Sequence, residues 1–358
     1  MKKIWIIIFF CNIHFGIYAG TDNEYLKDYK TPFPSPDIEL FVLQLNSTPF
    51  NLHGNIDGFL RKIANYIKTS TDDDYDRVKK VHDFVTLYLV YDYEAYKDFS
   101  RPLFPKKLPD QSVNSTILSR KAVCSGYAIL FMTLCNLIGI ECLYVSGYAR
   151  GGKWNPFRME RQNDKKYSHA WNIVIIKGFS YLVDCTWDSS NFKNRYEKEQ
   201  YSTEWLFVKP EHFIYSHFPE YSANQLLNHT LTFKEFKNMP YIRPDGIDYV
   251  KITKPKLTKI IYANKKKTFN YYLADGDLIK LELCDRYDKK ILKSIKVNYM
   301  NGFPGKLFFY HQNPGKYLLK IYYYNTTSGN SFYVGCIGYK IGFSGFDNYD
   351  VYTAKIDG

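Results

Sequence analysis

The sequence of 358 residues contains no Cys-x-x-Cys pair among its seven cysteines. That spacing is typical of zinc ribbons and of thioredoxin-like redox sites, so neither class is expected here. Once Cys11 and Cys124 are set aside for the reasons given below, an odd number of cysteines remains, which argues against a regular disulfide scaffold. We therefore predict no metal site and no bound cofactor.

A concentrated basic segment is also missing, although the formal net charge is +12. The lysines are scattered among acidic residues, and the one short run is Lys265–Lys267. Nucleic-acid binding requires a basic face together with a recognisable binding module, so nucleic acid is not an expected partner. The charge is better explained by solubility or by loose attraction to an anionic surface.

Long apolar runs are confined to the first twenty residues, where Lys2 and Lys3 precede the apolar stretch Ile4–Phe10 and small residues close the segment. This layout predicts a secretory signal peptide over residues 1–20. An uncleaved anchor is the alternative, but the apolar core is short against the ~20 residues that a membrane span needs. We expect a secreted, periplasmic or cell-surface protein with no transmembrane segment after the signal peptide.

The hydrophobic pattern divides the rest of the chain into three parts. Residues 21–50 are rich in Pro, Asn and Ser and are expected to form an extended lead-in. Residues 51–243 mix helical and strand patterns, which predicts one α+β domain. From residue 244 the helical periodicity disappears and short tyrosine-rich strands alternate with turns, so residues 244–358 are predicted to form an all-β, sandwich-like domain.

Three helices and three strands are expected before residue 190. Apolar residues recur at helical spacing over residues 56–67 and 75–89, and again from Cys124 to Ile138, where Gly139 marks the end. Residues 142–149 predict a strand, and the polar residues 152–167 predict a surface loop. Two apolar runs, 169–176 and 179–187, surround a short turn and predict a β-hairpin.

The hairpin carries His169 on one strand and Asp184 on the other. If the strands pair symmetrically about Lys177–Gly178, His169 lies opposite Thr186, and Asp184 is its diagonal neighbour on the same face of the sheet. Diagonal pairs lie ~7–8 Å apart, within reach of long side chains. A slip of one residue would move the two side chains to opposite faces.

Cys124 begins its predicted helix, where unpaired N–H groups and the positive end of the helix dipole favour a thiolate. A nucleophilic cysteine needs a base, and that base needs a group that orients it. We therefore predict Cys124 as nucleophile, His169 as general base and acid, and Asp184 as the residue that orients His169. A buried structural thiol beside an ordinary hydrogen-bonded histidine is the alternative, but all three residue types in this arrangement favour a triad.

Several segments together resemble the transglutaminase-like superfamily. Its Cys, His and Asp blocks and the preceding helix are similar to residues 122–142, 168–176, 181–188 and 75–96. Residues 205–227 and 231–242 resemble the kyphoscoliosis peptidase branch in particular. The resemblance implies a papain-like core, in which the helix bearing the nucleophile packs on an antiparallel sheet. It also implies that Trp171 and Trp187 form the wall of a cleft or part of the core.

This chemistry allows a thioester to form with a peptide or carboxamide carbonyl, followed by attack of water or of an amine. We expect an exported cysteine enzyme with a protein or peptide substrate, and hydrolysis is favoured because the nearest branch is described as peptidase-like. Two alternatives stay open: protein crosslinking by acyl transfer to lysine, and a non-catalytic scaffold on the same fold. In a scaffold, the β-rich C-terminal domain is the candidate surface for a cell-surface or polymer partner.

Overall fold

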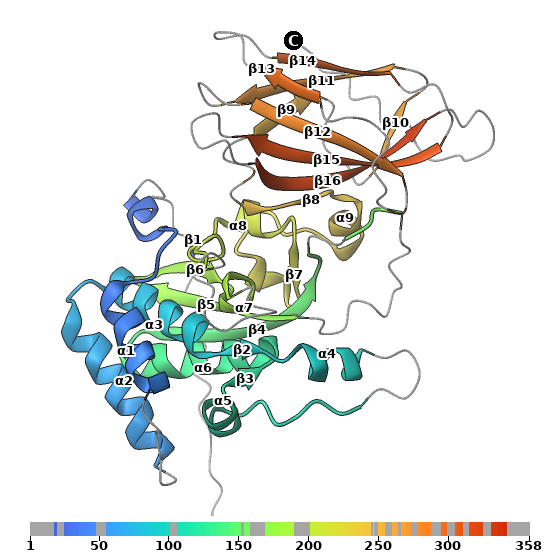
Figure 1. Ribbon diagram of the computed structural model, residues 1–358. Coiled ribbons are helices and arrows are strands. Elements are labelled where there is room, and N and C mark those ends of the chain that lie inside the picture. The colour runs from blue at the N-terminus through green and yellow to red at the C-terminus, as the bar shows by residue number, and fades with distance from the viewer. Residues whose placement is uncertain are drawn as a thin grey trace, which may run out of the picture.

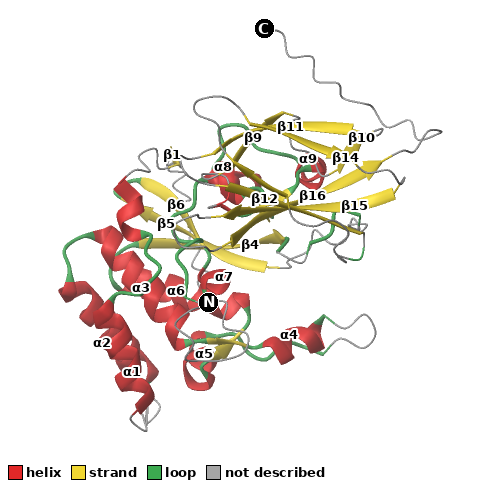
Figure 2. Cartoon of the chain, turned by 45° about the horizontal axis from the view of Figure 1, so that its top comes forward, coloured by secondary structure: helices red, strands yellow, loops and turns green. Residues whose placement is uncertain are grey.

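The computed structural model combines helices and sheets (Figures 1 and 2). The residues that it describes are 18–19, 25–47, 55–100, 106–151, 154–157, 169–189, 201–244, 246, 250–254, 260–263, 266–273, 278–285, 287, 295–298, 305–310, 315–324 and 331–341. Most of the predicted signal peptide and of the predicted loop 152–167 therefore lies outside the described residues. Within the described residues, no helix combines the length and the apolar character needed to cross a membrane.

The first layer is helical and consists of a short 3-10 helix, η1 (Tyr25–Tyr29), followed by α1 (Pro36–Ser47), α2 (Ile56–Ser70) and α3 (Asp74–Tyr88). The predictions of α2 and α3 are confirmed. Side chains cap both helices at their N-termini, since Asn55 accepts from Gly58 N–H and Asp73 accepts from Tyr75 N–H. The lead-in differs from the extended segment expected, because α1 folds there and buries Ile38 and Val42 against the core.

A second group of short elements leads to the helix of Cys124. It comprises β2 (Val90–Tyr91), α4 (Tyr93–Phe99), α5 (Val113–Ser119) and β3 (Lys121–Ala122), with β2 and β3 paired in parallel. Helix α6 then runs from Cys124 to Leu137, as its spacing predicts. Gly139 follows with φ +89°, a left-handed conformation that favours glycine and ends the helix.

The central five-stranded sheet lies beside α6 (Figure 1), and its strand order is β1-β6-β5-β4-β7. Its strands are β1 (Tyr18–Ala19), β4 (Glu141–Ala149), β5 (His169–Ile176), β6 (Phe179–Val183) and β7 (His217–Pro219). The hairpin β5–β6 has the predicted register, with Asn172 opposite Val183 and Ile176 opposite Phe179. Both turn residues, Lys177 and Gly178, have positive φ, as the tight hairpin turn that suits twisted strands requires.

Short elements connect the sheet to the C-terminal part. They are α7 (Cys185–Asp188), α8 (Pro210–Phe213), the 3-10 helix η4 (Ser222–Gln225), α9 (Phe233–Asn238) and β8 (Tyr241–Ile242). Helix α9 begins with a capping box formed by Thr232 and Glu235. Strand β8 follows the first domain and pairs with β16 (Ser331–Ile341) of the C-terminal part.

All described elements after residue 249 are strands. They are β9 (Val250–Lys254), β10 (Ile260–Ala263), β11 (Lys266–Leu273), β12 (Leu278–Asp285), β13 (Ile295–Asn298), β14 (Gly305–Tyr310), β15 (Gly315–Tyr324) and β16 (Ser331–Ile341). They form one sheet of order β10-β16-β15-β12-β13, which β8 joins beside β16, and a second sheet of order β14-β11-β9. The β-rich character agrees with the sequence, and the arrangement of the two sheets as a sandwich stays a prediction.

Two apolar cores cover the central sheet, one on each face, and a third cluster in the first domain contains Ile214, Phe218 and Phe236. The larger core packs α1, α2, α3 and α6 against the sheet and includes Phe84, Phe131 and Val174. The smaller core lies on the other face, around Trp171, Trp205 and Phe213. Because the sheet is clamped between these cores, the ends of its strands are fixed relative to the start of α6, where Cys124 lies.

Candidate active site

Cys124 is the first residue of α6 and is half-buried. The residue before it, Val123, donates its N–H to Oε1 of Gln111 at 2.9 Å, which fixes the chain as it enters the helix. No side chain of the N-cap residue caps the first turn of α6. The helix therefore presents its first N–H groups at the thiol, where a negative charge is stabilised by the helix dipole.

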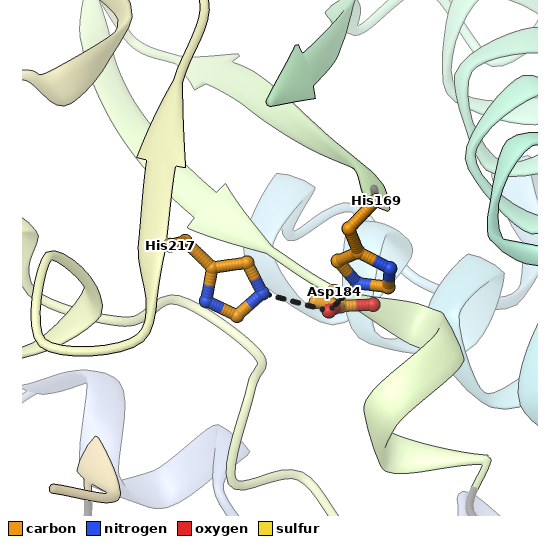
Figure 3. A group of neighbouring side chains, drawn as sticks. All are labelled: His169, Asp184 and His217. Atoms are coloured by element: carbon orange, nitrogen blue, oxygen red, sulfur yellow. Dashed lines mark hydrogen bonds and ion pairs between the residues drawn. The ribbon is translucent and has the colours of Figure 1, made fainter. Parts of the chain in front are cut away.

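His169 and Asp184 are brought into direct contact by the hairpin. His169 begins β5, and Asp184 follows β6 as the N-cap of α7. Nε2 of His169 lies 2.6 Å from Oδ2 of Asp184, and both side chains are buried (Figure 3). The diagonal contact expected from the register is thus present. Since Nε2 is engaged, Nδ1 is the nitrogen that remains for Cys124.

The Asp184 carboxylate is surrounded by hydrogen-bond donors. Oδ1 accepts the N–H groups of Thr186 at 2.9 Å and Trp187 at 3.2 Å, while Oδ2 contacts His169 and also Nε2 of His217 at 3.1 Å. Burial opposes ionisation, but the charge of His169 and the hydrogen bonds of both histidines outweigh it and place the pKa of Asp184 below its usual range. Asp184 is therefore a carboxylate in the neutral range.

His169 has the opposite shift. Burial alone lowers the pKa of His169, yet the charges of Asp184 and Cys124 and a hydrogen bond to each of them raise it to about 10. The imidazole is therefore protonated in the neutral range, and its two neighbours, Asp184 and Cys124, stabilise that protonated form. The arrangement places the imidazolium of His169 between the carboxylate of Asp184 and the sulfur of Cys124 at the N-terminus of α6.

His217 is a neighbour of this group that the sequence interpretation did not single out. It begins β7, has no exposed surface, and its Nδ1 lies 2.8 Å from Oγ of Ser216. Burial, together with the nearby charge of His169, lowers the pKa of His217 to about 4 although Asp184 acts in the other direction. It is therefore neutral near pH 7. The only sign in the sequence was its place in the 205–227 segment that resembles one branch of the family.

The two tryptophans predicted to form a wall occupy different environments. Trp171 is only 1% exposed and packs in the smaller core, with its ring 5.0 Å from that of His217. Trp187 is partly exposed, and its ring lies 5.1 Å from that of His169 and 4.3 Å from that of His217. Trp187 is therefore the one placed to shield the His169–Asp184 contact at the surface.

Two tyrosines that the sequence interpretation did not include, Tyr91 and Tyr144, are close enough to Cys124 for its charge to act on them. Burial raises the pKa of each hydroxyl, and the charge of Cys124 raises it further. Both hydroxyls therefore stay protonated near pH 7. They come from β2 and β4, which are far apart in sequence, so no local pattern links them to Cys124.

A second buried group of ionisable residues, His82 and Asp188, fixes the end of α7. Asp188 accepts the N–H of Trp205 at 2.9 Å and contacts Nε2 of His82 in α3 at 3.0 Å. The N–H of Asp184 in turn donates to the carbonyl of Trp205 at 3.0 Å. The backbone at Trp205 therefore holds both ends of α7, which fixes the position of Asp184.

The ligand atoms of His169, Asp184 and His217 all lie within 4.8 Å of one another, a spacing at which three residues can hold a metal ion. Here, however, each contact in the group is a hydrogen bond between a histidine and the same carboxylate oxygen, and the other oxygen has two backbone donors. The hydrogen bonds account for the arrangement without an ion.

Comparison with known proteins finds similarity to a family over part of the chain. Residues 61–185 match the transglutaminase-like superfamily. The kyphoscoliosis peptidase of Mus musculus is 26% identical over 275 residues, which make up 76% of this chain and 39% of that protein. Hillarin of Drosophila melanogaster is 27% identical over 130 residues, or 33% of this chain and 16% of hillarin. A crystal structure of a TGase is 17% identical with a TM-score of 0.31, covering 51% of this chain and 44% of that one.

The resemblance expected from the sequence is thereby confirmed: residues 61–185 form a transglutaminase-like domain. The chain spans about two fifths of the length of the mouse kyphoscoliosis peptidase that it matches.

Proposed function

Because residues 61–185 form a transglutaminase-like domain, we propose that this chain is a cysteine enzyme that acts on peptide or carboxamide bonds. Cys124 is the nucleophile, His169 the general base and acid, and Asp184 the residue that orients His169. The observation that carries the proposal is the 2.6 Å contact between His169 and Asp184, which leaves the other nitrogen of His169 for the thiol at the start of α6.

The reaction follows from these positions. The imidazolium of His169 holds the proton of Cys124, so the sulfur attacks the substrate carbonyl as a thiolate and forms a tetrahedral intermediate. The N–H groups at the start of α6 receive the negative oxygen. His169 then gives its proton to the leaving amine, and a thioester remains on Cys124. Neutral His169 takes a proton from water, and the resulting hydroxide attacks the thioester. The acid is released, sulfur leaves as the thiolate, and the pair of Cys124 thiolate and His169 imidazolium is restored.

Hydrolysis is the preferred outcome, and the similarity to a protein named as a peptidase supports it. Acyl transfer to lysine would use the same thioester with an amine in place of water. The two outcomes are separated by supplying a glutamine- and lysine-containing peptide mixture and measuring cleaved peptide, released ammonia and crosslinked peptide by mass spectrometry. Crosslinked product in excess of hydrolysed product would assign the transferase activity.

Export and a surface partner are part of the same proposal and rest on the sequence. The apolar leader and small residues at positions 19 and 20 support secretion. Cleavage after residue 20 would also remove β1 (Tyr18–Ala19), so the mature central sheet would end at β6. The tyrosine-rich strands after residue 244 are the candidate contact for a cell-surface or polymer partner. A mass-spectrometric determination of the mature N-terminus tests the first point, and a pull-down of the native surface polymer tests the second.

The decisive experiment is the alkylation of Cys124 by iodoacetamide as a function of pH, with the labelled peptide identified by mass spectrometry. We expect labelling to stay rapid at pH 6–7, where a free thiol reacts slowly, and to slow in His169→Ala. Buried Cys135, Cys142 and Cys185 serve as internal controls that should not react. An alkylation rate of Cys124 that depends on pH as that of an ordinary thiol does, and that is unchanged in His169→Ala, would favour the non-catalytic scaffold.

A further inference from the structure

The carboxylate of Asp184 contacts two histidines, whereas a catalytic triad contains one. Oδ2 contacts both Nε2 of His169, at 2.6 Å, and Nε2 of His217, at 3.1 Å (Figure 3). A carboxylate with its usual charge only accepts hydrogen bonds, so both ring nitrogens must carry a proton. The two histidines come from β5 and β7, which do not pair with each other but lie on either side of β4.

The surroundings of His217 make it a neutral donor. Its ring stacks on Phe213 at 4.0 Å and is further enclosed by the rings of Trp171, Trp187 and Trp205. The charged groups that act on it are Asp184 and His169. An aromatic enclosure strongly disfavours a second cation beside His169, whose ring centroid lies 5.4 Å away. The one hydroxyl proton of Ser216 has two acceptors within reach, Nδ1 of His217 at 2.8 Å and the carbonyl of Phe213 at 3.1 Å. In a neutral His217 ring with Nε2 donating to Asp184, Nδ1 is the acceptor and takes this proton.

We propose that His217 is a positioning residue: its Nε2–H group fixes Oδ2 of Asp184 and thereby holds His169 in the orientation that presents Nδ1 to Cys124. The proposal deepens the proposed function and rests on it for the role of His169. A neutral donor suits this task, because it adds no positive charge that would compete with the imidazolium of His169 for the same oxygen. The site then has four members rather than three, in the order Cys124, His169, Asp184 and His217.

Packing and hydrogen bonding at this position can be separated by substitution. His217→Phe keeps an aromatic ring against Phe213 but removes the donor, while His217→Gln returns an N–H donor without the ring. His229→Gln, at an exposed histidine outside the site, is the matched control. Thermal unfolding of each variant reports whether the fold is kept.

Two measurements are made on each variant. The first is the protonation of His169 between pH 5 and 11, measured by NMR on the ring nitrogens; it needs no substrate and no activity. The second is the rate of Cys124 alkylation at pH 7. Without the His217 donor, Oδ2 of Asp184 is no longer held in place and its contact with Nε2 of His169 weakens, so the pKa of His169 should fall by about one unit in His217→Phe. His169 stays protonated at pH 7, but the displaced imidazolium stabilises the Cys124 thiolate less, so alkylation should slow about tenfold. His217→Gln should recover most of both losses, and His229→Gln should match the native protein.

A measurement on the native protein covers the case in which His217→Phe does not fold. The nitrogen shifts of His217 should show a neutral ring protonated at Nε2, with no titration above pH 5. Titration near the ordinary histidine value would overturn the proposal. So would unchanged His169 protonation in folded His217→Phe, or an equal defect in the Phe and Gln variants, which would reduce His217 to packing. If Cys124 is alkylated at the same rate in the native protein and in His169→Ala, the proposed function fails. The NMR result still decides the role of His217.

Discussion

The buried ion pair inside α3 offers a sharp test of how the first domain is held together. Nζ of Lys79 lies 2.7 Å from Oδ2 of Asp83, and the two side chains are 7% and 0% exposed. Asp83 also accepts the N–H of Ser35 at 2.7 Å and the hydroxyl of Tyr201. One carboxylate therefore joins the segment before α1, helix α3 and the chain that leads to Trp205.

Asp83→Asn removes the negative charge and leaves the Lys79 cation buried without a counterion. Breaking a buried pair in this way costs about 3–5 kcal/mol of the free energy of unfolding. Replacing both partners in Lys79→Met/Asp83→Asn removes the stranded charge, so the double variant should be more stable than Asp83→Asn by about 2 kcal/mol. The measurement is urea unfolding at pH 7 with linear extrapolation.

A matched control is available on the surface, where Glu94 and Lys97 lie 3.8 Å apart and are 79% and 56% exposed. Glu94→Gln should change the free energy of unfolding by less than about 0.5 kcal/mol. If Asp83→Asn costs no more than this control, or if the double variant is as unstable as the single one, then the pair does not behave as a desolvated contact and the reasoning fails.

The same carboxylate predicts a pH dependence. Burial tends to raise the pKa of Asp83, but the hydrogen bond of His82 and the charge of Lys79 lower it from 3.8 to about 2. Because the folded value is the lower one, the stabilisation is present above about pH 4 and is lost as the pH falls towards 2. The loss amounts to about 2 kcal/mol, and it should be absent in Asp83→Asn.

Three further outcomes are expected. The pKa of His169 rises from 6.5 to about 10 on folding, so its stabilisation is complete below pH 6.5 and declines by up to about 1.4 kcal/mol per pH unit towards pH 10; urea unfolding should show this slope, and a flat profile would contradict it. A methyl group at Gly147 would lie 2.3 Å from a backbone carbonyl of β7, so Gly147→Ala should lower the melting temperature and slow labelling of Cys124. Gly151→Ala should do neither, because its added methyl group would meet Trp187 at an ordinary contact distance of 3.9 Å. Thr232→Ala breaks the capping box with Glu235 and should cost about 1 kcal/mol, measured by thermal unfolding.

Local patterns were enough to predict much of the first domain. Helices α2, α3 and α6, strand β4 and the hairpin β5–β6 all lie where periodicity placed them. The hairpin register was predictable because the two-residue turn at Lys177 and Gly178 leaves one symmetrical pairing. The His169–Asp184 contact follows from that register alone, which is why two residues 15 positions apart could be paired without an alignment.

The prediction of an extended lead-in over residues 21–50 is wrong for residues 36–47, because proline does not exclude a helix that begins with it. Pro32, Pro34 and Pro36 suggest an extended chain, but Pro36 is the first residue of α1, a position at which proline is well tolerated because its missing N–H would be unpaired anyway. The apolar residues Ile38, Val42 and Leu45 that follow are spaced for a helix and are buried. The prolines mark where the helix begins rather than excluding it.

His217 could not be predicted from local pattern for a different reason. It lies 33 residues after Asp184, and it reaches the site only because β7 adds to the far edge of β4, with Gly147 opposite both His169 and Pro219. Strand order of this kind is a property of the tertiary fold and leaves no periodic signal. Tyr91 and Tyr144 were missed for the same reason, since each approaches Cys124 from a separate element.

The place of β7 also sets a lower limit on the length of a fragment that folds cleanly. A piece ending at residue 185, where the superfamily match ends, would remove β7 and leave β4 with an open edge of unpaired backbone groups. Such edges pair readily with other chains, so that piece should aggregate. Ending at residue 242 keeps β7 but removes β16, so β8 loses its partner strand and its backbone groups are left unpaired. Limited proteolysis should accordingly find few cuts that release a soluble half.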